Sequence, residues 1–156
     1  MKKSIILSAF VCLTTLCSIK AQETGSLTVT VSNIKTQEGV IMVGLYKDEN
    51  TFLEKVFKTQ KTEANSDSVT LTFDHIPAGE YGISLFHDKD ENGKLNTNFI
   101  GIPSEPYAFS NNAKGMFGPA KWEDVKFSVI DKETIQNITL SELGIIHPVI
   151  PTLGYL

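Results

Sequence analysis

The stretch "SVTLTFDHIPAGEYGISLFHD" (68–88) decides the fold, because it holds two alternating segments around one tight turn. Every second residue is apolar on either side of the turn: Val69, Leu71, Phe73, Tyr81, Ile83 and Leu85. A period of two is typical of half-buried strands. Pro77 and Gly79 occupy the second and fourth positions of "IPAG" (76–79), as a type I turn prefers. The stretch therefore predicts two antiparallel strands that share one apolar face.

The flanking sequence extends this pattern in both directions. Strands are expected at 25–34, 39–46, 68–76, 80–88, 124–130 and 134–141, the last two as a closing hairpin. Segment 39–46 is apolar on both faces, which suits a strand covered on both sides. Only 49–60 groups its apolar residues at the spacing of a helical turn. The pattern predicts an all-β fold, an antiparallel Greek-key β-sandwich of about seven strands.

The two ends of the chain differ in composition from the middle. Residues 1–21 combine two early lysines, an uncharged apolar run and a small residue, Ala21, at a cleavage position. This is the pattern of a secretory signal peptide, and the run is shorter than the roughly 20 residues of a membrane span. We therefore expect a secreted, periplasmic or cell-envelope protein. Its β-sandwich domain is 22–141, and 142–156 is an apolar tail with prolines.

Composition limits the possible partners. Both cysteines lie within residues 1–21, so the mature chain has no disulfide and no thiol nucleophile. It carries eleven lysines against eighteen acidic residues, a net charge of −7, and no arginine. Arginine provides bidentate recognition of phosphate, and nucleic-acid binding relies on positive charge. The sequence therefore excludes nucleic acid, and it predicts an envelope or extracellular partner and no transmembrane span in the mature chain.

Residues 89–123 form an excursion of thirty-five positions without an expected strand. Loops this long are uncommon in compact domains and are usually functional or disordered. The excursion is too rich in apolar residues for disorder, so these residues must be buried or bind something. We expect it to lie across the sandwich, with Phe99, Tyr107, Phe109 and Trp122 largely buried.

The start of the excursion, "HDKDENGKLN" (87–96), matches the first half of the calcium-loop template D-x-[DN]-x-[DN]-G. Phe99 stands where a bidentate Glu closes an EF-hand, and the flanks are strands, so the loop is not an EF-hand. The candidate calcium ligands are Asp88, Asp90, Asn92, the backbone carbonyl of Lys94, Asn96 and, as the missing carboxylate, Glu105. The alternative is a polar turn whose side chains bond their own backbone.

Two further functions remain open at this point. His87 with Asp88 or Asp90 suggests a small metal-assisted hydrolase, although the chain has no G-x-S-x-G elbow and no S-x-x-K motif. A groove under residues 99–118 suggests a small-ligand carrier. The ligand-binding candidates are His87, Tyr107, Phe109, Asn111 and Asn112. Without an assembled catalytic motif, binding is favoured over catalysis, and no catalytic residue is assigned.

Several blocks together carry a family resemblance. "G.LTVTVSNIKTQEGVIMVGLY" is followed by "LTFDHIPAGEYGISLFHDKDENGKLNTNFIGIPSEPYAFSNNA" and then by the expected closing hairpin. This order resembles the bacterial domain-of-unknown-function family 2141 over about residues 25–141. Segment 73–81 is also similar to prealbumin-like and carboxypeptidase-regulatory sandwiches. The resemblance implies an exported seven-stranded sandwich and no assigned reaction. The expected function is a binding or scaffolding module of the envelope.

Overall fold

The computed structural model of the chain describes residues 24–115, 118–130 and 132–141. The expected signal peptide and the apolar tail lie outside these residues. The elements are β1 (Thr24–Ser32), β2 (Val40–Tyr46), η1 (Glu49–Thr51), β3 (Lys58–Glu63), β4 (Ser68–Pro77), β5 (Gly79–Asp88), β6 (Tyr107–Phe109), η2 (Ser110–Asn112), α1 (Trp122–Val125), β7 (Phe127–Val129) and β8 (Glu133–Thr139). None of the helices in this part of the chain has the length and apolar character needed to cross a membrane.

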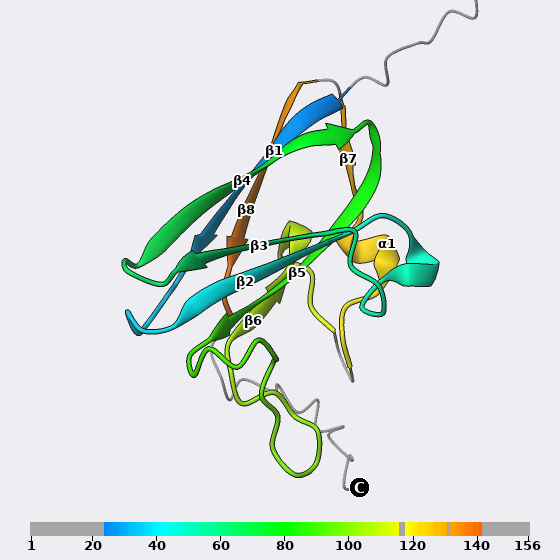
Figure 1. Cartoon of the computed structure of the whole chain (residues 1–156). Helices are drawn as coiled ribbons and strands as arrows, with labels where there is room; N and C mark the ends of the chain where they lie inside the picture. The colour runs from blue at the N-terminus through cyan, green and yellow to red at the C-terminus, as the bar shows by residue number, and fades with distance from the viewer. Residues whose placement is uncertain (1–23, 116–117, 131, 142–156) are drawn as a thin grey trace, which may run out of the picture.

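The strands form two sheets that pack face to face (Figure 1). One sheet has the order β4-β1-β8, and the other has the order β3-β2-β5-β6, with β7 also paired to β5. All these pairs are antiparallel except β1 with β8, which is parallel. The predicted all-β sandwich is confirmed, with eight strands among the described residues and one mixed sheet.

The predicted closing hairpin of 124–130 and 134–141 is wrong. β7 pairs with β5, whereas β8 runs parallel to β1 in the opposite sheet. Pairing with β1 places Ile138 in the core with no exposed surface, and Leu140 follows it there with 2% exposed. A two-stranded hairpin at the edge would leave these apolar side chains in water, so burial decides the partner of each strand.

The core lies between the sheets and consists of the residues that alternate inward. Its members include Leu27, Val29, Val31, Ile41, Val43, Leu45, Val69, Leu71, Phe73, Tyr81, Ile83 and Leu85. Burying one such aliphatic or aromatic side chain contributes about 1.5–3 kcal/mol. Tyr81 also keeps its hydroxyl satisfied, donating to the Pro77 carbonyl at 2.9 Å. The alternation seen in 68–88 therefore predicts the core correctly.

Sequence reasoning missed strand β3. Residues 49–60, expected to hold a helical turn, contain the short 3-10 helix η1 and the start of β3. The β3 sequence "KTQKTE" is polar throughout and lacks alternation, as suits an edge strand. Lys58 Nζ donates to the Asp74 carbonyl at 2.8 Å, and Gln60 Nε2 donates to the Thr72 carbonyl at 3.3 Å. These side chains cover the otherwise open edge of β4.

The second half of the excursion covers the outer face of β2 and β5. Phe109 and Trp122 are 4% and 7% exposed and pack with Phe52, which lies just after η1. Gly82 of β5 provides the room, because a Cβ there would lie 2.9 Å from the Trp122 ring. The core covers one face of segment 39–46, and this aromatic cluster covers part of the other face, as predicted.

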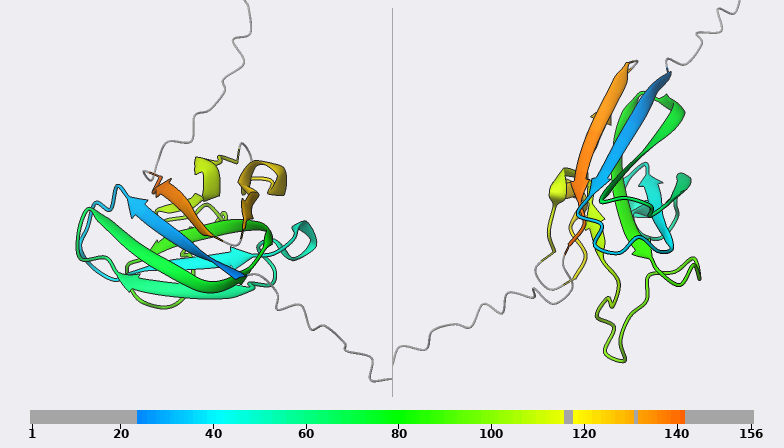
Figure 2. Two further views of the ribbon diagram at one scale, coloured as in Figure 1. Left: turned by 90° about the horizontal axis from the view of Figure 1, so that it is seen from above. Right: turned by 90° about the vertical axis from the view of Figure 1, so that its left-hand side faces the viewer.

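The first half of the excursion behaves differently. Residues 97–103 form a hairpin tip that projects from one end of the sandwich (Figures 1 and 2). Phe99 is 98% exposed, so the prediction that it is buried is wrong. The reason is that nothing in the described part of the chain lies opposite this tip, whereas Phe109 and Trp122 have a sheet face beneath them.

Candidate metal site

The pairing of β5 with β6 brings two distant carboxylates together. Ser84 faces Phe109 and Phe86 faces Tyr107 across the antiparallel pair. The ladder continues beyond β6, because the His87 backbone N–H donates to the Pro106 carbonyl at 2.8 Å. In this register, the next facing residues on the outer side are Asp88 and Glu105.

Both carboxylates are buried and are bonded to backbone N–H groups. Asp88 is 1% exposed and Glu105 is 4% exposed. The Asp88 carboxylate accepts from Asn92 N–H at 3.1 Å and from Gly93 N–H at 2.8 Å. The Glu105 carboxylate accepts 2.9 Å bonds from the N–H groups of Lys89 and Asn96. Hydrogen bonds to an ionised acceptor are strong, so the two acids hold the loop closed from both sides.

Asp90 completes the cluster from the exposed side of the loop. Its Oδ2 accepts from the side-chain amides of Asn92 at 2.8 Å and Asn96 at 2.9 Å. The bond from the Asn96 side chain is the largest of the causes that lower the pKa of Asp90 below its ordinary value, and bonds from Asn92 add to it. The ionised form of Asp90 is therefore favoured in the folded protein.

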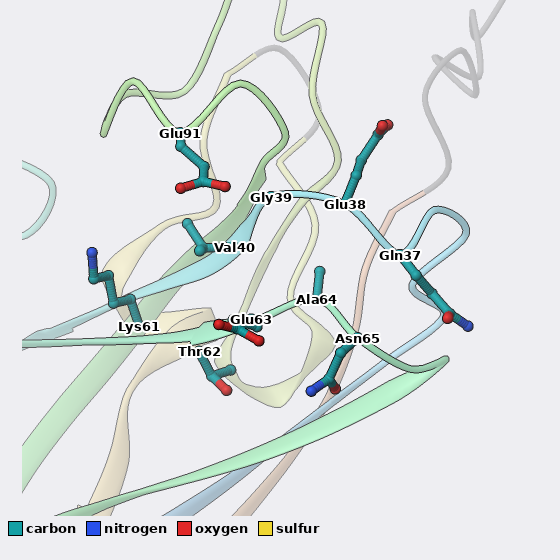
Figure 3. Close-up of a pocket in the computed structure, with 10 residues that line it drawn as sticks. All are labelled: Gln37, Glu38, Gly39, Val40, Lys61, Thr62, Glu63, Ala64, Asn65 and Glu91. Carbon is teal, nitrogen blue, oxygen red and sulfur yellow. The ribbon is translucent and has the colours of Figure 1, made fainter.

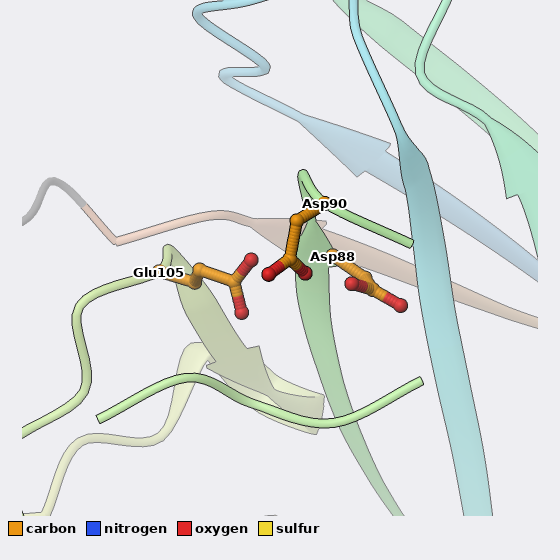
Figure 4. A group of neighbouring side chains, drawn as sticks. All are labelled: Asp88, Asp90 and Glu105. Atoms are coloured by element: carbon orange, nitrogen blue, oxygen red, sulfur yellow. The ribbon is translucent and has the colours of Figure 1, made fainter. Parts of the chain in front are cut away.

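One carboxylate oxygen from each of Asp88, Asp90 and Glu105 lies within 4.8 Å of the other two. Figure 4 shows the three groups together, with the Glu105 carboxylate directed toward that of Asp90. Each carboxylate has about four lone-pair positions. Since the hydrogen bonds to Asp88 and Glu105 use one position on each oxygen, both acids keep free positions that an ion can use.

Two other predicted ligands, the side chains of Asn92 and Asn96, lie in the same loop and use their oxygens in hydrogen bonds within it. Asn92 Oδ1 accepts from the Lys94 backbone N–H at 2.8 Å, and Asn96 Oδ1 accepts from Asn92 Nδ2 at 2.8 Å. Both amides turn donors toward Asp90. The Asp88 and Asn92 bonds to nearby N–H groups are those expected of a polar turn.

His87 does not join this cluster. It follows the inward alternation of β5, is 1% exposed, and its Nε2 lies 2.7 Å from the Glu38 carbonyl oxygen. Asp88, the next residue, points to the opposite face of the strand. The geometry gives no support to a hydrolytic pair of His87 with Asp88.

The residues proposed to line a ligand groove have structural partners. Phe109 is buried against Phe52, and Tyr107 is half-buried and stacks edge-on against Phe109 at 5.8 Å. Asn111 Nδ2 donates to the carbonyls of Asp124 and Lys126. These contacts cover the sheet face and leave no free stacking platform at Phe109.

Asn112 binds the edge of β8 in the manner of a paired strand. Its Nδ2 donates to the Asn137 carbonyl at 3.1 Å, and its Oδ1 accepts from Thr139 N–H at 2.8 Å. Ser110, which sequence reasoning did not select, is fully buried and joins β5 to α1 through Ile83 N–H and the Val125 carbonyl. Structural contacts therefore account for the polar residues of the segment "SNNA" (110–113).

A surface hollow of about 400 Å³ lies beside the loop, between the β1–β2 connection and β3 (Figure 3). Its lining includes Gly39, Lys61, Glu63 and Glu91. A second hollow, of about 380 Å³, lies at the far end of the first sheet around His75. Both open onto solvent, and neither is lined by the described residues of 99–118.

Comparison with known proteins identifies the family. The sequence model of the family described as "Uncharacterized protein conserved in bacteria (DUF2141)" matches residues 29–137. The match runs from β1 to β8 and includes the carboxylate cluster and the whole excursion. No curated protein and no solved structure matches the chain. The likeness of 73–81 to prealbumin-like sandwiches stays a prediction. Because the match covers more than half of the chain, the protein belongs to the bacterial DUF2141 family.

Proposed function

We propose that the protein is an exported binding or scaffolding module of the bacterial cell envelope whose loop 87–96 is stabilised by calcium. Export is supported by the signal-peptide pattern of residues 1–21. The ion is supported by one observation above all, the convergence of Asp88, Asp90 and Glu105. The loop sequence alone offers the first two acids, and the β5–β6 register adds the third.

The charge of the cluster favours a cation. Like charges directly opposite each other across an antiparallel pair are destabilising, and burial strengthens their repulsion. Asp88 and Glu105 lie two residues beyond the last facing pair, Phe86 and Tyr107, with carboxylate oxygens within 4.8 Å of each other, and both are buried. A divalent ion between them would offset the repulsion while the backbone N–H bonds stay in place. A polar turn by itself explains the bonds of Asp88 and Glu105 to backbone N–H groups, but it does not require a third acid, Asp90, to converge on the buried pair.

Calcium fits the donor set better than other common metals. The acids and amides of the loop offer only hard oxygen ligands, and calcium accepts six to eight of these in flexible geometry. The amides of Asn92 and Asn96 would have to turn their oxygens inward, away from their present bonds with Asp90. Extracellular modules of this kind bind calcium with dissociation constants on the order of 10⁻⁴ to 10⁻³ M.

Thermal unfolding in chelator and in millimolar calcium tests this proposal. At about ten times the dissociation constant, binding to the folded state adds about 1.4 kcal/mol to the free energy of unfolding. For a domain of this size, the melting temperature should rise by roughly 2–6 °C. The same titration with magnesium should give a smaller shift, because magnesium demands near-ideal octahedral geometry.

Two charge-matched variants separate the ion site from general electrostatics. Asp90→Asn removes one acid of the cluster from an exposed position and leaves the buried pair intact. Glu91→Gln removes the neighbouring exposed acid, which does not belong to the cluster. The calcium shift should disappear in Asp90→Asn and persist in Glu91→Gln. Equal shifts in both variants would place the ion elsewhere, and no shift in the unmodified protein would identify the loop as a polar turn.

A further inference from the structure

The hairpin tip, residues 97–103, presents apolar side chains to water at one extreme of the molecule. Phe99 is 98% exposed, Ile100 is 63% exposed and Ile102 is 36% exposed. Two views agree that this tip extends beyond the body of the sandwich (Figures 1 and 2). Single exposed apolar residues are ordinary, but three of them within four positions of one projecting hairpin need an explanation.

The backbone of the tip is organised by Asn98. Its Oδ1 accepts from the N–H groups of Ile100 and Ile102, each at 3.0 Å. Its own N–H donates to the Ile102 carbonyl at 2.8 Å, and Gly101 N–H donates to the Asn98 carbonyl at 3.0 Å. Below these bonds, Thr97 forms a bridge with Pro103. The tip is therefore a hydrogen-bonded turn, and four of its N–H groups have partners within the tip.

These internal bonds matter because they lower the cost of leaving water. A backbone N–H that enters an apolar medium without a partner is strongly disfavoured. Residues 95–104, "LNTNFIGIPS", also contain no charged side chain. The tip thus combines exposed apolar groups, four N–H groups with internal partners and no charge, while acids lie only at its base.

We propose that the hairpin tip inserts Phe99 and Ile100 into the apolar layer of a lipid bilayer, with the sandwich standing on the membrane surface. A fluid bilayer accepts a narrow convex tip without a matching surface. A stable protein interface, in contrast, buries about 800 Å² per partner, more than two or three side chains provide. The chain is acidic and has no arginine, so an anionic lipid surface would repel it. The matching lipid surface is therefore a zwitterionic one.

This inference goes beyond the proposed calcium site and does not require it. Insertion depends on Phe99 and Ile100, which lie outside the carboxylate cluster. All measurements are therefore made in chelator, where the cluster holds no ion. A failure of insertion then leaves the calcium proposal untouched, and a failure of the calcium shift leaves insertion untouched.

The test places a fluorescent reporter in the hairpin tip and uses the full chain. Phe99→Trp adds a second tryptophan to the buried Trp122, the only native one. The protein is mixed with phosphatidylcholine vesicles whose acyl chains are brominated, which quench only emission from within the bilayer. Relative to the unmodified protein, the Phe99→Trp variant should lose most of its added emission, with a shift of that emission to shorter wavelength.

A matched control shows that the effect belongs to the tip. Ile135→Trp changes another exposed apolar residue, 57% exposed on β8, and should show no quenching. Adding Ile100→Asp to Phe99→Trp should raise the lipid concentration for half-maximal quenching by on the order of tenfold or more. Quenching of the emission added by Phe99→Trp reports insertion of the tip itself, even if another part of the chain also contacts the vesicles.

Three results would overturn the proposal. One is an unquenched Phe99→Trp variant in the presence of brominated vesicles, the outcome expected if the tip instead docks on a protein. Another is equal quenching of the Phe99→Trp and Ile135→Trp variants. The third is shielding of the Phe99→Trp reporter from aqueous iodide before vesicles are added. Such shielding would show that another segment, such as residues 142–156, covers the tip.

Discussion

The two halves of the excursion both carry large apolar side chains, but these side chains reach opposite environments. In the second half, Phe109 and Trp122 are buried against the outer face of β2 and β5, whereas the hairpin tip leaves Phe99 98% exposed. Each half contains large apolar residues, and each has an Asn in a left-handed or capping position of a turn.

The difference lies in where the backbone of each half finds its hydrogen-bond partners. Residues 107–109 pair with β5 as strand β6, which fixes Phe109 on the sheet face. In the hairpin tip, four N–H groups have partners within the tip around Asn98, and among the described residues no hydrogen bond joins the tip to the sheet. An aromatic side chain is buried when its backbone is anchored to a surface that has room for it. Composition alone does not decide this.

The largest test of the comparison removes one aromatic ring from each half. Trp122→Ala empties a buried site against Phe52, and it should lower the free energy of unfolding by about 3–5 kcal/mol. Phe99→Ala removes an exposed ring and should change it by less than about 0.5 kcal/mol. Chemical denaturation of both variants provides the measurement. Similar losses in the two variants would contradict the assignment of one half as cover and the other as free tip.

A smaller effect is expected from filling the space beneath Trp122. Gly82→Ala places a Cβ 2.9 Å from the Trp122 ring and 3.1 Å from Val125, which should cost about 1–3 kcal/mol. Gly79→Ala is the matched control in the same strand, because its Cβ would come no closer than 3.6 Å to its nearest neighbour, Tyr81. If denaturation midpoints fall equally for both variants, the cost comes from the strand backbone and the Trp122 contact is unimportant.

The smallest effect concerns the polar base of the hairpin. Because the pKa of Asp90 is lowered in the folded state, its carboxylate stabilises the fold above the ordinary Asp pKa, about 3.9. That contribution is lost as the pH falls through the lowered value. Asn96→Ala should raise the pKa of Asp90 toward its ordinary value, and Asn92→Ala should raise it less. NMR titration of the Asp90 carboxyl carbon measures both, and the reverse order would contradict the dominant role of Asn96.

Most of the strands could be predicted from the local alternation of apolar and polar residues. Alternation in 68–88 predicts β4, β5 and the inward residues of both, because a strand's side chains repeat with period two. Strand β3 escaped prediction, since a polar edge strand has no buried face and therefore no alternation. The pairing of β8 with β1 also escaped, because partner choice depends on which apolar surfaces remain open once the other strands have packed.

For the site, the sequence by itself determined a tight loop of alternate Asp and Asn residues closed by Gly93, and it marked Glu105 as a further acid. Only the tertiary structure decided that the Glu105 carboxylate lies within 4.8 Å of those of Asp88 and Asp90, because the pairing of β5 with β6 brings these segments together. It alone also decided that Phe109 is buried and Phe99 is exposed. The position of Glu105 and the burial of Phe109 but not Phe99 both depend on the surface that lies opposite each residue. That surface comes from distant parts of the chain, so a local strand or turn pattern cannot predict it.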